Sequence, residues 1–165
     1  MASLIEELLA TLEEQKENYA DLLVLSEEKI NVIAKNDIEM LTKITKAESV
    51  IVGSNQKLDK KREECVKNIG IVLNHNPDEL TLTKIANLIN NLDEKSAILK
   101  IKDELEKILV SLKSKNEINN QLIESSLDYV DFSVNLMRQA AKGEVTLSEI
   151  GEIKQDNKNL YDTKG

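Results

Sequence analysis

Apolar side chains recur every three or four residues over most of the first 142 positions, which is the spacing of one face of an α-helix. Residues 3–35 carry the first such pattern. Ser3, followed by Glu6, has the spacing of a capping box at its start. Asn36 suits a left-handed helix end, and Asp37 suits the N-cap of a following helix. The pattern therefore predicts two helices joined by a tight turn.

Residues 38–73 predict the second helix, with a heptad seam in which spacings of three and four alternate. The middle of this seam is half polar, with Glu48, Asn55 and Arg62 among its members. A tight, permanent coiled coil along it is therefore disfavoured. Cys65 lies on the same seam, and we interpret it as a small buried hydrophobe rather than a reactive thiol.

Pro77 marks the next break, because the residue before a proline is pushed out of the α region. Asn76 and Pro77 suit the first positions of a short helix over 77–92. His75 is assigned to the turn. The last predicted helix runs from about Asp93 to Lys142 and is about 70 Å long at 1.5 Å per residue, so we expect the first two helices to cover much of it.

This last helix carries two apolar stripes. The main stripe is broken by Asn116 and Asn119, and its members are Ile98, Ile101, Leu105, Ile108, Leu109, Leu112, Ile123, Leu127, Val130, Val134, Met137 and Ala141. The second stripe exists only beyond this break and consists of Ile118, Leu122, Tyr129, Phe132 and Leu136. A helix that is apolar on two faces needs a partner on each. We expect Leu105, Leu112, Ile123 and Val130 to be buried and the second stripe to be partly exposed.

The two asparagines and the second stripe each have more than one interpretation. Asn116 and Asn119 either fix the register of the helices by hydrogen bonding, as polar seam residues do, or mark where a surface for another polypeptide begins. The second stripe is covered either by the helix at 77–92, by self-association, or by a protein client. If it is a client site, its residues are Ile118, Leu122, Tyr129, Phe132 and Leu136.

The predicted fold class is all-α: an elongated, antiparallel, coiled-coil-like helical bundle of three long helices and one short helix. The bundle domain is expected to span 1–142. Residues 143–165 lose the periodic pattern and mix Gly, Asn, Lys and Asp, so they are predicted to form a mobile C-terminal tail.

Composition excludes several functions. A net charge of -8 over 165 residues disfavours nucleic acid and anionic lipid as partners. No stretch is apolar enough to cross a bilayer, and a single cysteine without a signal-peptide pattern favours the cytosol. One histidine, no second cysteine and no glycine-rich phosphate loop leave no metal site, cofactor site or catalytic group to propose. The protein is therefore predicted to bind another protein and not to be an enzyme.

Three segments in order resemble the FlgN-type flagellar export chaperones: LIEELL at 4–9, KNDIEML at 35–41 and NNQLIESSLDYV at 119–130. The resemblance implies a cytosolic chaperone that binds hook-associated proteins, the proteins of the hook–filament junction. It also implies delivery of these clients to the flagellar type III export apparatus, with the C-terminal helix and tail contacting the client. Capture of an amphipathic client helix in an apolar groove is compatible with the second stripe.

The alternative is a structural coiled-coil protein that self-assembles through the half-polar seam of residues 41–72 and has no specific client. It predicts a constant oligomer.

Overall fold

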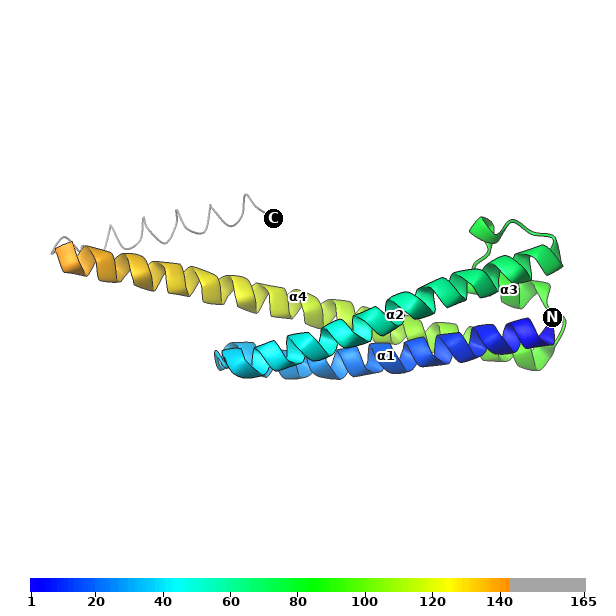
Figure 1. Ribbon diagram of the computed structural model, residues 1–165, viewed down its shortest axis with the longest axis horizontal. Coiled ribbons are helices and arrows are strands. Elements are labelled where there is room, and N and C mark those ends of the chain that lie inside the picture. The colour runs from blue at the N-terminus through cyan, green and yellow to red at the C-terminus, as the bar shows by residue number, and fades with distance from the viewer. Residues whose placement is uncertain (143–165) are drawn as a thin grey trace. The chain divides into compact units, whose positions relative to one another are not determined.

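The computed structural model describes residues 1–142, together with their side chains except those of residues 129, 130 and 140–142. The chain forms α1 (Ala2–Ala34), α2 (Ile38–Leu73), a 3-10 turn (Pro77–Glu79), α3 (Leu82–Leu88) and α4 (Leu92–Lys142) (Figure 1). The described residues contain no strand, so the all-α prediction of three long helices and one short helix is confirmed.

The chain divides into two compact units, Met1–Asn116 and residues from Glu117 onward, and α4 contributes to both. The predicted single bundle domain over 1–142 stays a prediction, and the predicted mobile tail, 143–165, lies outside the described residues.

The turn between α1 and α2 has the predicted caps. Asn36 adopts a left-handed conformation with φ 56°, and Asp37 Oδ1 accepts a hydrogen bond from the backbone N–H of Met40 at 3.1 Å. The predicted capping box at Ser3 is wrong: α1 begins at Ala2 with Met1 as its N-cap and no side-chain cap bond. The backbone N–H of Leu4 donates to the Met1 carbonyl at 3.1 Å, so Ser3 already lies inside the first turn.

The segment between α2 and α4 differs from its prediction. The helix expected over 77–92 is a 3-10 turn followed by the two-turn helix α3. Asn76 caps the 3-10 turn as expected, but this turn ends at Leu80. Thr81 then starts α3, with its side chain accepting from the N–H of Lys84 at 3.2 Å. A second capping residue inside the segment therefore divides it. Asn91 Oδ1 accepts from the N–H groups of Asp93 and Glu94, where α4 begins.

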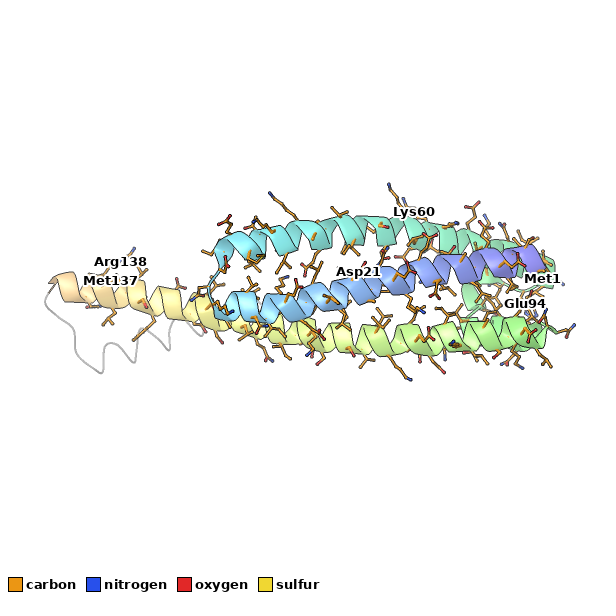
Figure 2. All side chains as sticks on the ribbon, turned by 90° about the horizontal axis from the view of Figure 1, so that it is seen from below. Met1, Asp21, Lys60, Glu94, Met137 and Arg138 are labelled. Carbon is orange, nitrogen blue, oxygen red and sulfur yellow. The ribbon has the colours of Figure 1, made fainter. Side chains whose placement is uncertain are left out.

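The first unit is a bundle in which α1 and α2 run antiparallel, with the first part of α4 beside them (Figures 1 and 2). Its core lies where these three helices meet α3. The buried members of this core cluster are Ile5, Leu8, Leu12, Cys65, Ile69, Ile85, Ala86, Ile89, Ile98, Ile101 and Leu105. Cys65 is 2% exposed, which confirms its interpretation as a buried small residue.

The half-polar seam of α2 faces α1 within the same chain, and each of its three polar positions pairs with an α1 side chain. The paired atoms are Lys29 Nζ and Glu48 Oε2 at 3.0 Å, Asn18 Nδ2 and Asn55 Oδ1 at 2.9 Å, and Arg62 Nη1 and Gln15 Oε1 at 3.4 Å. Hydrogen-bonded groups that are at least half-buried between two helices fix which positions lie opposite each other. The polar seam residues thus specify the register of the α1–α2 hairpin.

Candidate protein-binding face

The described part of the second unit is a stretch of α4, residues 117–142, and it carries the second stripe. Ile118 is 39% exposed, while Leu122, Phe132 and Leu136 are half-buried. These four residues share one side of the helix because of their spacing. Tyr129 continues the spacing within the helix, but its side chain lies outside the described part. The stripe is partly exposed as far as it is described.

The main stripe behaves differently in the two parts of α4. In the first unit Leu105 is buried, as predicted, and Ile98 and Ile101 of the same stripe are buried with it. Leu112 and Ile123 are only half-buried, so their predicted burial is wrong, and the side chain of Val130 is outside the described part.

Beyond residue 123 the described members of the main stripe are exposed: Leu127 is 46% exposed, Val134 41% and Met137 71%. Figure 2 shows Met137 and Arg138 together near the end of the described helix. Helical spacing determines which residues share a face, but it does not determine whether another element covers that face. The exposure of Leu127, Val134 and Met137 therefore could not be predicted from the sequence.

Polar side chains border these apolar faces. Asn116 Oδ1 accepts a hydrogen bond from Ser26 Oγ of α1 at 3.0 Å, which is the register role considered for this residue. Asn119 is 2% exposed. Asp128, one turn before Phe132, has its Oδ1 atom buried and without a hydrogen-bond partner in the described part of the chain. A buried carboxylate oxygen in that state can accept a hydrogen bond from a donor group of another polypeptide.

In the first unit, a surface groove of about 440 Å³ lies between α1 and α4. Lys16 Nζ contacts Glu104 Oε2 at 2.7 Å and Glu13 Oε1 at 2.8 Å along its edge. The hydrogen bond to Glu104, followed by that to Glu13, holds the pKa of Lys16 well above its ordinary value. The same bond to Lys16 lowers the pKa of Glu104. Both groups therefore stay charged near neutral pH and join the two helices, so neither is suited to proton transfer.

No other feature of the described residues indicates chemistry. Burial raises the pKa of the Cys65 thiol, which disfavours the reactive thiolate. His75 is exposed in the connection after α2, as expected for a turn residue. Among the residues that the structure describes, no group of three or more His, Cys, Asp or Glu side chains is placed to hold a metal ion. The same part of the chain has no helix long and apolar enough to cross a membrane.

The family model for the FlgN protein matches residues 1–161, nearly the whole chain. The chain belongs to the FlgN family. Its general role is therefore that of a chaperone in flagellum assembly, as the resemblance of the three segments predicted. No curated protein and no solved structure matches the chain, so the family assignment rests on this comparison.

Membership in the FlgN family is consistent with a protein-binding stripe, but it does not test which residues form it. Ile118, Leu122, Tyr129, Phe132 and Leu136 stay a predicted client site. The assignment also does not distinguish this stripe from the exposed part of the main stripe, which lies on another face of the same helix. The two faces therefore need separate tests.

Proposed function

We propose that this FlgN-family protein acts in the cytosol, where it binds the amphipathic terminal helix of a hook-associated protein along the second stripe. Binding covers the apolar face through which such a client would otherwise assemble too early. The chaperone then delivers the client to the flagellar export apparatus. The observation that supports this proposal best is a partly exposed apolar stripe on residues 117–142 of a chain that belongs to a flagellar chaperone family.

The shape of the stripe suits a helical client. Ile118, Leu122 and Leu136 lie along one side of α4, over about 27 Å at 1.5 Å per residue. An amphipathic client helix of similar length could place its own apolar residues against them, which is the helix-in-groove mode of recognition. Because the stripe is only partly exposed, the area available for burial is modest, and this favours a client that can later be released.

The polar border contributes specificity. Asp128 has a buried, unsatisfied carboxylate oxygen one turn before Phe132. A client side chain that donates a hydrogen bond to this atom would remove its desolvation penalty, whereas an apolar client residue at the same place would leave that penalty in full. The proposal therefore favours clients with a hydroxyl, amide or basic side chain beside their apolar face.

The competing interpretation, a structural coiled coil assembled through residues 41–72, has less support. Ile44, Leu58 and Ile69 of that seam are buried in the first unit. The seam's polar positions pair with α1 of the same chain. A surface that is filled within one chain is not available to a second chain without opening the hairpin.

The test is titration of the chain with a synthetic terminal helix of a hook-associated protein, together with thermal melting. We expect Phe132→Ala to weaken binding by more than about 1 kcal/mol if Phe132 anchors the client, since anchor residues carry most of the binding energy. Its melting temperature should fall less than that of a core variant, because Phe132 is only half-buried and lies outside the core cluster.

Val110→Ala is the matched control, since Val110 lies on the same helix, is 71% exposed and belongs to neither stripe. It should bind the client helix as the original chain does. If Phe132→Ala binds normally, or if it unfolds the protein as readily as loss of a core residue does, the second stripe is not the client site.

A further inference from the structure

Beyond residue 122 the main stripe has the spacing of a regular coiled-coil seam. Its members Ile123, Leu127, Val130, Val134, Met137 and Ala141 are separated alternately by four and three residues. This is the a/d spacing with which one helix packs along another. Leu127, Val134 and Met137 are 46%, 41% and 71% exposed, so no described part of the chain fills the seam at these positions.

We propose that this seam, Ile123–Ala141, binds the same seam of a second copy of the chain in antiparallel orientation. The proposal is independent of the client site, because the second stripe lies on another face of the helix. It also differs from the structural coiled-coil alternative, whose seam lies in α2 and is filled by α1.

The charges beside the seam select the orientation. On one edge stand Glu124, Asp131 and Arg138, seven residues apart, and on the other stand the small residues Ser126, Ser133 and Ala140. In an antiparallel pair the like edges meet. Glu124 of one copy then lies opposite Arg138 of the second copy, and the two-fold axis repeats this pair.

One contact opposes this arrangement. Asp131 lies midway between Glu124 and Arg138, so in the antiparallel pair it faces its own counterpart. Two attractive contacts and one repulsive contact still leave a net attraction. In the parallel arrangement the charged edge of each copy would meet the serine edge of the other, and no opposite charges would pair. Exposed ion pairs are individually weak, so they set direction, while burial of the apolar seam supplies the affinity.

The seam is short, so we expect a dimer that dissociates on dilution. Leu127 of one copy would pack near Met137 of the second, and Val130 near Val134, so each copy covers the most exposed residue of the other. Ser126 and Ser133, which flank the seam on one edge, have small side chains and so do not keep the two helices apart.

Analytical ultracentrifugation of the full chain, without client, from micromolar to millimolar concentration provides the first test. We expect a reversible monomer–dimer equilibrium. Met137→Asp should raise the dissociation constant at least about tenfold, because it places a charge in the buried seam. Val110→Asp is the matched control: Val110 is also 71% exposed on α4 but lies off the seam, and it should leave the equilibrium unchanged.

A charge-swap cycle tests the orientation. Arg138→Glu should weaken the dimer, because both cross-pairs become repulsive. Adding Glu124→Arg to Arg138→Glu should restore it. The two positions are about 21 Å apart along one helix, so they cannot compensate for each other within a single chain. Both residues are exposed, so these variants should fold and melt normally.

A monomer at every concentration would overturn the proposal. So would a dimer that Met137→Asp leaves intact, or one that Val110→Asp weakens equally, because either result places the interface elsewhere. If Arg138→Glu weakens the dimer and the double variant does not restore it, the antiparallel pairing is wrong. Loss of client binding by Phe132→Ala would bear only on the proposed function and not on this interface.

Discussion

Two stretches of one helix have the same apolar spacing and different surroundings. In residues 92–116, the main stripe of α4 places Ile98 and Ile101 in the core with α1, α2 and α3. In residues 117–142, the same stripe leaves Met137 71% exposed. The difference shows that the same apolar spacing on one helix does not always mark a face that is buried in the fold. In the first stretch it serves folding, and in the second it leaves surface that another polypeptide can cover.

The largest expected effect comes from truncating the stripe on each side of this divide. Ile98→Ala should lower the free energy of unfolding by about 2–5 kcal/mol, because Ile98 is 0% exposed and its loss leaves a cavity. Met137→Ala should change it by less than about 0.5 kcal/mol, as surface substitutions do. Urea denaturation of both variants measures the contrast. Equal losses would show that both stretches belong to one packed core.

A second prediction compares two glycines of α2. A Cβ at Gly70 would lie 2.9 Å from the His75 carbonyl oxygen and 2.9 Å from Pro77 Cγ, so Gly70→Ala should destabilise by about 1–3 kcal/mol. A Cβ at Gly53 meets nothing within 4 Å, so Gly53→Ala should stabilise the helix by about 0.5–1 kcal/mol. Thermal melts should therefore shift in opposite directions. Two shifts of the same sign would mean that the chain packs differently around Gly70.

A third prediction compares the starts of α1 and α2 in the first unit. Asp37→Ala should cost about 1 kcal/mol, because it removes the side-chain acceptor for the N–H of Met40. Ser3→Ala should cost almost nothing, because Ser3 makes no cap bond at the start of α1. Chemical denaturation of the two variants compares them directly. If Ser3→Ala lowers the free energy of unfolding by about as much as Asp37→Ala does, Ser3 caps α1 after all, as the sequence pattern predicted.

The smallest effect concerns the ion pair between α1 and α4. The hydrogen bond from Lys16 lowers the pKa of Glu104 in the folded chain. The pair therefore contributes stability fully above the ordinary Glu pKa of 4.5, and this contribution is lost as the pH falls through the lower folded value. At the alkaline end, the raised pKa of Lys16 preserves the contribution up to the ordinary Lys value of 10.5, and the contribution is lost above it.

Glu104→Gln should therefore melt slightly below the original chain at neutral pH, and the difference should shrink in acid. Glu106→Gln is the control, since Glu106 pairs only within its own helix, with Lys102 at 3.3 Å. An acid-independent difference for Glu104→Gln would show that its effect comes from packing instead of charge.

Much of the fold could be predicted because it depends on local rules. The first two long helices end beside Asn36 and Asn74, which take left-handed conformations, and the sequence marked these two ends by Asn36 and by the break before Pro77. The segment after Pro77 was harder. Asn76 caps the 3-10 turn and Thr81 caps α3, and the sequence prediction recognised only the first of these two capping residues.

The candidate site was predictable only in part, for a related reason. Spacing places Leu122, Phe132 and Leu136 on one side of α4, and the structure leaves them half-buried. Spacing also places Leu112 and Leu105 together, yet only Leu105 is buried. Burial depends on which neighbouring element reaches each turn, and this is a property of the assembled chain. A single sequence gives the faces of a helix, and the structure shows which faces are covered.

The burial of Cys65 has a practical consequence for kinetics. Its thiol is the only one in the chain, is 2% exposed, and packs in the core cluster with residues of α1, α3 and α4. A chromogenic disulfide reagent reacts with the thiolate, so it can react here only when the bundle opens. The reaction rate under native conditions, divided by the rate for an unfolded thiol, then gives the opening equilibrium of the core. The chain therefore contains a built-in reporter with which every core variant can be ranked in plain buffer, without denaturant.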